Sequence, residues 1–314
     1  MSKFHIGISG WRYAPWRNNF YPKGLIQRKE LYFASRSVNS IEINGSFYAL
    51  QTPERYDGWY ADTPDNFVFS VKAPRYITHI RRLDNVEEPI ANFFASGLLQ
   101  LREKLGAILW QFPPSFKFNE EQFHLFLRLL PKTMGEALKS TRKYHPDFEL
   151  PEPLAKATRL RHAVEIRNQS FIEPKFIKLL RKYNVAFVIA DTAGRWPYAE
   201  DITSDFVYMR LHGDTELYRS GYSKSAIEHW YKRIKAWSRG SHPKDAKLIG
   251  KRVRLHESLD VFCYFDNTDK LWAPQDARQL SALLGIDKDL EKQGDLFKEI
   301  EAELKEIEAE RKAS

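Results

Sequence analysis

Short apolar segments that end in polar residues spaced two apart recur along this chain. The clearest examples are Ile41–Asn44, Val164–Arg167 and Tyr208–His212. Because side chains on a strand alternate between its faces, the polar residues of each segment point to one side and the aliphatic residues to the other. These polar sets are Glu42 with Asn44, Glu165 with Arg167, and Arg210 with His212. Buried charges cost free energy unless they meet partners, water or a ligand, so a shared polar pocket at the strand ends is expected.

Eight strand-like runs alternate with helix-like segments. Strands are expected at residues 4–9, 40–44, 67–72, 107–111, 163–167, 186–191, 206–212 and 261–267. Helices are expected at residues 27–37, 54–61, 89–104, 120–130, 174–183, 225–238 and 274–284, whereas the link between Asp191 and Phe206 is too short for one. Alternation predicts a parallel sheet. Eight repeats without a glycine-rich dinucleotide motif favour an α/β TIM (β/α)₈ barrel over an open sheet.

The barrel is expected to form a single domain over residues 1–286, with two additions. Residues 131–161 are polar and basic and contain Pro146, Pro151 and Pro153, so we interpret them as an irregular insertion between a helix and the fifth strand. Residues 287–314 are charged and place apolar residues at helical spacing, which predicts an amphipathic C-terminal helix that docks on the barrel. The apolar positions are Phe297, Ile300, Leu304 and Ile307. Both additions are candidate contacts for other proteins.

Charge is distributed unevenly. The formal charge is +8, but residues 287–314 hold ten acidic and six basic residues, so the rest of the chain carries +12. A basic body weakly favours anionic partners. The single cysteine, Cys263, excludes an intramolecular disulfide, and no stretch reaches the roughly 18 apolar residues of a membrane span. With no signal-peptide pattern at the amino terminus, a cytoplasmic protein without membrane contact is expected.

If the barrel forms, polar residues at the ends of its strands surround one mouth, where this architecture usually places function. They are Glu42, Asn44, Lys72, Gln111, Glu165, Arg167, Asp191, Arg210, His212, Asp266 and Asn267. Three cations among them, Lys72, Arg167 and Arg210, are suited to clamp a phosphate or carboxylate. The alternative is a charge-balanced network in which these cations pair with the acidic residues and no ligand is involved.

Four of these residues are candidates for catalysis, namely Glu165, His212, Glu42 and Asp191. For Glu165 and Glu42, proton transfer and the orienting of an arginine are equally open, because pairing perturbs a carboxyl group without making it catalytic. The same four side chains form a possible set of divalent-metal ligands. Interleaved arginines and the lack of a recognised metal motif count against it, and no cofactor is assigned.

Aromatic residues follow several strands and would overhang the mouth. Trp11, Tyr13 and Trp16 follow the first strand, Phe47 and Tyr48 the second, and Tyr218 and Tyr222 the seventh. Aromatic faces beside arginines stack nucleobases or sugars, but loop aromatics also pack as lids over a core. His79, after the third strand, has the same two interpretations.

The segments at the strand ends carry a resemblance to a known family. They are Ile6–Trp11, Ile41–Asn44 with Phe47 and Tyr48, Phe69–Pro74 with Ile77–His79, Trp110–Phe116, Ala163–Arg167, and Met209–Gly213. In these segments the chain resembles the YecE-like family, a domain-of-unknown-function family assigned to the TIM-barrel architecture. Departures occur at Ile8, Asn168 and Asp266, where threonine, histidine and asparagine are usual. The resemblance implies the barrel and no settled activity.

Three functions follow as hypotheses. The first is a barrel whose mouth binds a phosphorylated or otherwise anionic ligand, possibly part of a nucleic acid, through Lys72, Arg167 and Arg210, with help from Asn44, Tyr48, Gln111, Trp11, His79 and Asn267. The second is a metal-dependent hydrolase or isomerase, by fold-level analogy with endonuclease-IV-type and xylose-isomerase-type barrels. The third is a non-catalytic scaffold.

Overall fold

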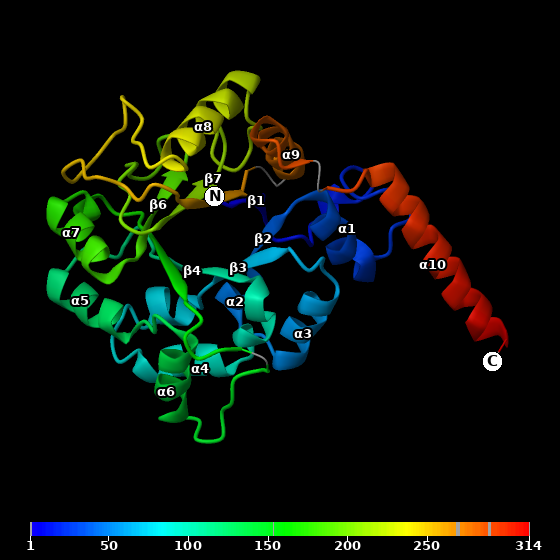
Figure 1. Ribbon diagram of the computed structural model, residues 1–314, viewed down its shortest axis with the longest axis horizontal. Helices are drawn as coiled ribbons and strands as arrows, with labels where there is room; N and C mark the ends of the chain where they lie inside the picture. Colours follow the sequence, from blue (N-terminus) through cyan, green and yellow to red (C-terminus); the bar gives the residue numbers. More distant parts are fainter. Residues whose placement is uncertain (1, 153, 268–270, 288–289, 314) are drawn as a thin grey trace.

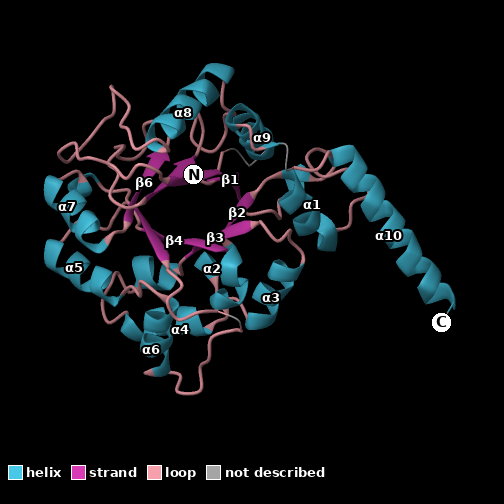
Figure 2. Ribbon diagram, in the orientation of Figure 1, coloured by secondary structure: helices cyan, strands magenta, loops and turns pink. Residues whose placement is uncertain are grey.

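The protein forms a closed barrel of eight parallel strands, each paired with its neighbours in chain order, in a computed structural model that describes residues 2–152, 154–267, 271–287 and 290–313. The strands are β1 (Phe4–Ser9), β2 (Ser40–Ile43), β3 (Val68–Lys72), β4 (Leu105–Gln111), β5 (Arg161–Glu165), β6 (Ala186–Asp191), β7 (Phe206–Leu211) and β8 (Asp260–Phe265). Figure 2 shows the strands at the centre and the helices around them. The sequence-based prediction of a TIM barrel is confirmed.

Helices follow most strands and cover the outside of the barrel. They are α1 (Glu30–Ser37), α2 (Gly45–Tyr48), α3 (Pro53–Ala61), α4 (Glu87–Ala95), α5 (Glu120–Leu129), α6 (Met134–Arg142), α7 (Pro174–Tyr183), α8 (Lys224–Trp237), α9 (Ala273–Leu284) and α10 (Gln293–Ala313). No helix in the described ranges has the length and apolar character needed to cross a membrane. As expected from its length, the link from Asp191 to Phe206 contains no helix among its residues, all of which are described.

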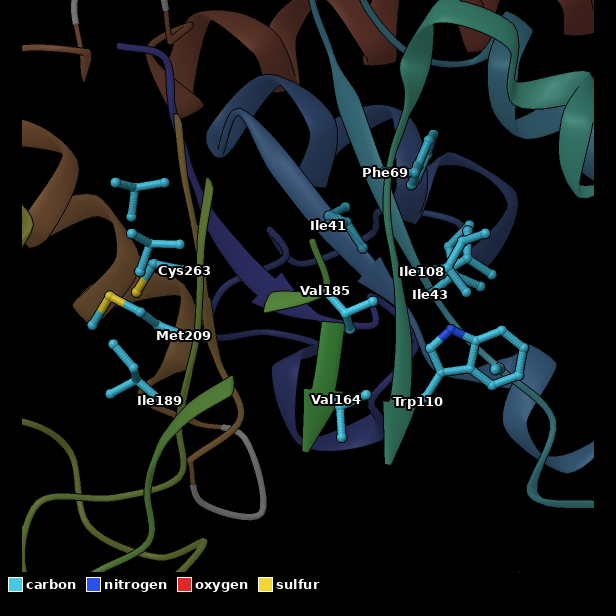
Figure 3. Close-up of a cluster of buried hydrophobic side chains, with 14 of the residues drawn as sticks. Ile41, Ile43, Phe69, Ile108, Trp110, Val164, Val185, Ile189, Met209 and Cys263 are labelled. Atoms are coloured by element: carbon cyan, nitrogen blue, oxygen red, sulfur yellow. The ribbon is translucent and has the colours of Figure 1, made fainter. Parts of the chain in front are cut away.

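Two apolar layers hold the barrel together. Outward-facing strand residues such as Ile41, Phe69, Val164 and Met209 pack against the helices and form the larger core (Figure 3). Inward-facing residues alternate with them and fill the barrel interior with small and aromatic side chains: Val68, Ala107, Leu109, Ala163, Ala186, Val188, Ala190, Phe206, Tyr208, Phe262 and Tyr264. The inward positions become polar again toward the carboxyl ends of the strands, so the polar mouth lies on a mostly apolar plug, whose opposite end carries the Arg161–Asp260 ion pair.

The prediction of one continuous helix over residues 89–104 is wrong. Helix α4 ends at Ala95, and a separate 3-10 segment spans Leu98–Lys104. Gly97 separates them with φ 104°, in the left-handed region, and a Cβ at this position would lie 2.4 Å from Cα of Pro53. The backbone of α3 therefore approaches so closely that glycine alone fits.

The interpretation of residues 131–161 as irregular is wrong in part, because they contain α6. The hydroxyl of Thr133 accepts a hydrogen bond from the Glu136 amide, and the Glu136 carboxylate accepts one from the Lys132 amide. This is close to a capping box, a signal that the prolines obscured. Helix α6 buries Met134 and Leu138 against α4, so the segment extends the core. Pro153 lies outside the described residues.

The C-terminal helix α10 docks on α1 through its first half, as expected. Leu296 and Ile300 are buried, and Lys29 of the segment before α1 pairs with Glu303 at 2.6 Å. The rest of α10 extends away from the barrel (Figure 1). The side chain of Ile307 lies outside the described part of this helix.

Candidate functional site

A cavity of about 980 Å³ opens at the carboxyl ends of the strands. Its lining comes from the ends of β2, β3, β4, β5, β7 and β8 and from the loops that follow them. The lining residues are Tyr13, Asn44, Phe47, Tyr48, Lys72, Arg75, His79, Ile80, Gln111, Arg167, Arg210, Tyr218 and Asp266. Eleven of the residues expected at or above the mouth from the sequence therefore meet in one cavity: Tyr13, Asn44, Phe47, Tyr48, Lys72, His79, Gln111, Arg167, Arg210, Tyr218 and Asp266.

Arg210 is the centre of a buried ionic network in the floor of this cavity. Its side chain is 1% exposed and donates from Nη1 to Glu165 Oε2 at 2.7 Å and from Nη2 to Asp266 Oδ2 at 2.8 Å. Two further hydrogen bonds, at 3.1 and 2.9 Å, reach the carboxylate of Glu42. Burial alone would lower the pKa of Arg210, but these carboxylates raise it well above its ordinary value. A guanidinium engaged on all sides orients the carboxylates and has little left to offer a ligand.

Glu42 is held from below as well as by Arg210. Ser9 donates its hydroxyl to Glu42 Oε1 at 2.8 Å, and Tyr208 donates its hydroxyl to Oε2 at 2.6 Å. Burial, and then the charge of Glu42, raise the pKa of Tyr208 well above its ordinary range, so the tyrosine remains a donor. We call Ser9, Glu42, Glu165, Tyr208, Arg210 and Asp266 the Arg210 network. This network matches much of the alternative expected from the sequence, in which ion pairs balance the charges at the mouth without a ligand.

Glu165 links the network to the wall of the cavity. Its Oε1 accepts from Arg167 Nε at 2.8 Å, on the side opposite Arg210. Burial would raise the pKa of Glu165, but Arg167 and Arg210 outweigh it and hold that pKa well below its ordinary value. The carboxylate is therefore a weak base. Glu42 and Glu165 are both fully buried beneath the lining, so proton transfer to a ligand from either would require the network to open.

Arg167 presents one face of its guanidinium to the ring of Trp196, at 3.8 Å from the ring centroid. Its Nη2 lies 3.4 Å from the hydroxyl of Tyr218, whose backbone has φ 62°. Tyr218 belongs to the loop after β7, and Gly213 near the start of this loop has no room for a side chain, because a Cβ would lie 2.3 Å from the carbonyl oxygen of Glu216. The stacked, tethered guanidinium is therefore fixed in orientation while its outer edge borders the cavity.

Lys72 is a buried cation of the mouth that lacks an acidic partner among the described residues. Its side chain is 8% exposed, and within the described residues its ammonium makes no ion pair or hydrogen bond. Its Nζ lies over the ring of Phe47, 4.2 Å from the ring centroid. Burial, reinforced by the charge of Arg210 and opposed by Glu165 and Glu42, lowers the pKa of Lys72 to about 7. Near neutral pH much of this lysine is an uncharged amine.

His79 and Gln111 form a neutral polar edge beside Lys72. A π-helical turn, Tyr76–Ile80, brings His79 over the cavity, where its Nε2 lies 3.4 Å from Gln111 Nε2 and its ring meets Phe47 edge to face. Burial, and then the nearby charges of Lys72 and Arg167, lower the pKa of His79 to about 4. Irregular helical turns of this kind are frequent at functional sites. Asn44, across the cavity, has a buried Oδ1 with no hydrogen-bond partner in the structure.

His212 points inward as its parity predicts, but it is fully buried. Its Nε2 lies 3.4 Å from Arg210 Nη1 and its Nδ1 lies 3.3 Å from Asp266 Oδ2, beneath the rings of Trp196 and Tyr218. Burial and the charge of Arg210 lower its pKa. Its position suits a neutral imidazole that supports Asp266 rather than one that touches a ligand.

Five expected mouth residues lie elsewhere, and two of them, Trp16 and Tyr222, are buried in the outer core. On β6 the inward positions are Ala186, Val188 and Ala190, so Asp191 faces outward, accepts a hydrogen bond from Tyr222 at 3.0 Å and borders a different cavity. Asn267 is likewise one residue out of phase with Tyr264 and Asp266 and donates to Asp276 of α9 at 2.7 Å. Trp11 packs in the outer core against Trp59 of α3. Strand parity could have removed Asp191 and Asn267 in advance.

The residues considered as metal ligands do not form a ligand set. Arg210 stands between Glu42 and Glu165, His212 faces that arginine, and Asp191 is on the other side of its strand. Within the part of the chain that the structure describes, no group of three or more histidine, cysteine or acidic side chains is arranged to hold a metal ion.

Several residues of the site were not predicted from the sequence. Tyr208 lies two positions before Arg210 on the same strand, so its parity was a usable signal. Arg75 and Trp196 come from loops, where no periodicity reports which way a side chain points. Arg75 is exposed, borders the cavity, and has no ion-pair partner among the described residues.

Comparison with known families and proteins confirms the resemblance to the YecE-like family. A family model described as "Protein of unknown function DUF72" matches residues 5–298. The UPF0759 protein YunF of Bacillus subtilis is 29% identical over 177 residues, and the UPF0759 protein YecE of Escherichia coli K12 is 29% identical over 146 residues. These matches cover 55% and 46% of this chain, and 53% and 49% of the two relatives. The chain thus spans about half the length of the curated relatives it matches.

Solved structures share the architecture. A DUF72 family protein from Thermotoga maritima superposes with a TM-score of 0.66 at 23% identity, covering 90% of this chain and 99% of that one. One from Enterococcus faecalis superposes with a TM-score of 0.61 at 19% identity, covering 90% and 95%. At these identities the likeness shows the fold alone.

Proposed function

Because the chain belongs to the DUF72 family of proteins of unknown function, we propose a function from the site itself: the mouth of the barrel binds a small anionic ligand, phosphorylated or carboxylated, against Lys72, Arg75 and Arg167. The observation that carries this proposal is the separation of charge at the mouth. Three carboxylates are committed to Arg210 and Arg167 in the floor, whereas Lys72 and Arg75 border the cavity without an acidic partner in the described residues.

The lining itself is cationic. Lys72, Arg75, Arg167 and Arg210 border the cavity, and Asp266 is the acidic residue beside them. A low-dielectric wall strengthens the attraction between these cations and an anion. Arg210 uses its hydrogen-bond donors within the Arg210 network. The cations that we propose to bind the anion are therefore Lys72, Arg75 and Arg167, with Arg75 in place of the Arg210 expected from the sequence.

The walls also suit an apolar or sugar-like body attached to the anionic group. Tyr13, Phe47, Tyr48 and Tyr218 border the cavity, and Tyr48 is 73% exposed at its rim. A concave cavity with a few converging polar groups is typical of small-molecule sites. Asn44 and Gln111 supply amide groups for hydrogen bonds to hydroxyl groups of such a ligand.

Isothermal titration calorimetry tests this function. The probes are inorganic phosphate, pyrophosphate and citrate at low ionic strength, titrated into the full chain and into Lys72→Met and Arg75→Ala. Loss of one charged contact should weaken binding about tenfold or more. Arg254→Ala is the matched control, because Arg254 is 90% exposed and lies outside the cavity. Absence of binding by all three anions, or binding that both mouth variants leave unchanged, would contradict the proposal.

A single-stranded oligonucleotide with a terminal phosphate serves as a further arm of the same experiment. Binding to a strand through many phosphates falls steeply with salt, whereas capture of one terminal group has a shallow salt dependence. Binding with a shallow salt dependence that is lost in Arg75→Ala would indicate that the terminal phosphate occupies the cavity. Binding with a steep salt dependence that is unchanged in Arg75→Ala would place nucleic-acid binding elsewhere on the basic body.

A further inference from the structure

Lys72 lies in the mouth, and its ammonium has no ion-pair or hydrogen-bond partner among the described residues. It leaves the carboxyl end of β3, is 8% exposed and borders the cavity. The two nearby carboxylates, Glu42 and Glu165, are taken up by Ser9, Tyr208, Arg167 and Arg210. A buried lysine whose ammonium makes no ion pair or hydrogen bond among the described residues is costly to keep, which is the situation in which a functional role is expected.

Lys104 shows what a structural buried lysine looks like in the same molecule. It is 2% exposed, and its ammonium donates to the carbonyl oxygens of Tyr60 and Thr63 at 2.8 Å each and contacts the hydroxyl of Thr63. These bonds satisfy its charge. Among the described residues Lys72 has no such acceptor: its Nζ lies over the ring of Phe47, and the nearby carboxylates of Glu42 and Glu165 accept hydrogen bonds from other side chains.

We infer that Lys72 is a nucleophilic amine that forms an imine with a carbonyl compound carrying an anionic group, which takes the anion binding proposed above as its premise. Burial and the nearby charge of Arg210 disfavour the ammonium form, so the lysine that borders the cavity is available there as a free amine. Arg75 and Arg167 in the same lining would hold the phosphate or carboxylate of the substrate and so fix the position of its carbonyl carbon.

The chemistry balances without a further reactant. Nζ attacks the carbonyl carbon, a C–N bond forms, and the C=O electron pair moves to oxygen, which takes the proton that leaves nitrogen. The resulting carbinolamine loses its hydroxyl group and one further proton as water to give the imine. The substrate class is therefore an aldehyde or ketone of a phosphorylated sugar or of a keto acid.

Reductive trapping tests the inference. The full chain is incubated at pH 7 with dihydroxyacetone phosphate or with uncharged dihydroxyacetone, together with cyanoborohydride, which reduces an imine to a stable secondary amine. Peptide mass spectrometry then locates the adducts. With the phosphorylated probe, Lys72 should react about 10- to 100-fold faster than an exposed lysine such as Lys178, because far more of it is uncharged at that pH.

Variants separate this step from anion binding. Lys72→Arg keeps a cation without a nucleophile, so it should bind phosphate yet yield no adduct at residue 72. Arg75→Ala should slow trapping of the phosphorylated probe while leaving the uncharged probe unaffected. Labelling confined to exposed lysines such as Lys178, with phosphate still bound, would overturn the imine step and leave the anion site standing. Equal trapping of both probes on Lys72 would overturn the selection for an anionic group.

Discussion

Arg210 and Glu42 face each other across the centre of the barrel, and two hydrogen bonds join them: Nε to Oε2 at 3.1 Å and Nη2 to Oε1 at 2.9 Å. The two residues are 168 positions apart in the chain, on β7 and β2. Both are almost completely buried. The bidentate pair therefore fixes the relative position of two strands that are not neighbours in the sheet, and it forms the floor on which the mouth stands.

Removal of one partner from this pair should destabilise the protein strongly. Arg210→Met leaves Glu42, Glu165 and Asp266 close together without their shared cation, and an unpaired buried charge costs about 3–5 kcal/mol. Urea unfolding measures the loss. The double variant Glu42→Met with Arg210→Met should lose less free energy of unfolding than the two single variants together. Each single variant leaves the other residue of the pair without its counter-charge, whereas the double variant removes both. Additive losses would contradict the direct coupling of the two residues.

Lys72→Met should stabilise the protein, whereas Lys104→Met should destabilise it. The folded-state pKa of Lys72, about 7, lies below the ordinary 10.5, so the unfolded chain binds the proton more tightly and Lys72 penalises the fold below pH 10.5. Removing it should increase the free energy of unfolding at pH 7 by about 2–4 kcal/mol. Lys104→Met instead leaves the Tyr60 and Thr63 carbonyl groups without a donor. Chemical unfolding of both variants at pH 7 and pH 10 makes the comparison, and a Lys72→Met protein less stable than the parent at pH 7 would refute it.

His162 should make the fold sensitive to mild acid. Its Nε2 donates to the carbonyl oxygen of Pro131 at 2.7 Å, and its Nδ1 accepts from Trp110 Nε1 at 3.1 Å, so the neutral ring has no free site for a proton. Burial lowers its pKa from 6.5 to about 4, against the opposing effect of the Pro131 carbonyl.

The sign follows from linkage. The unfolded chain takes up a proton at this histidine below pH 6.5 and the folded chain only near pH 4. The stabilisation that neutral His162 gives the fold is therefore complete above pH 6.5 and is lost as the pH falls toward 4. The loss should amount to about 3 kcal/mol. In His162→Gln the free energy of unfolding should vary less over this interval, which urea unfolding at several pH values would measure. An unchanged slope would show that other groups, such as His5 and His79, account for the effect.

Arg167→Lys should lower the affinity for anions while changing stability little. A lysine keeps the charge but loses the flat contact with Trp196 and the fixed bond from Nε to Glu165. Because the fixed orientation of the guanidinium is lost, phosphate should bind about tenfold more weakly. Fluorescence of the tryptophans and calorimetry together report both effects, and equal phosphate affinity in the variant would argue against Arg167 as a ligand contact.

The barrel and the floor of the site were accessible from the sequence because both depend on a period of two. Tyr208, Arg210 and His212 share one face of β7, and Glu42 and Glu165 occupy inward positions on their own strands. Applied consistently, the same rule places Asp191 and Asn267 outside the barrel. Arg75 and Trp196 could not be foreseen, since loop geometry carries no period, and neither could the commitment of Arg210 to three carboxylates, which requires distances across the barrel.

Binding of an anion in the mouth against Lys72, Arg75 and Arg167 underlies both proposals. A crystal structure of the full chain soaked at pH 7 with tungstate, a phosphate-like oxyanion whose anomalous scattering marks its position, would show that anion directly. We expect an anomalous peak in the cavity within hydrogen-bonding distance of at least two of these three side chains, and loss of that peak in Arg75→Ala. Anomalous peaks confined to lysines on the outer helices, with an empty mouth, would contradict it.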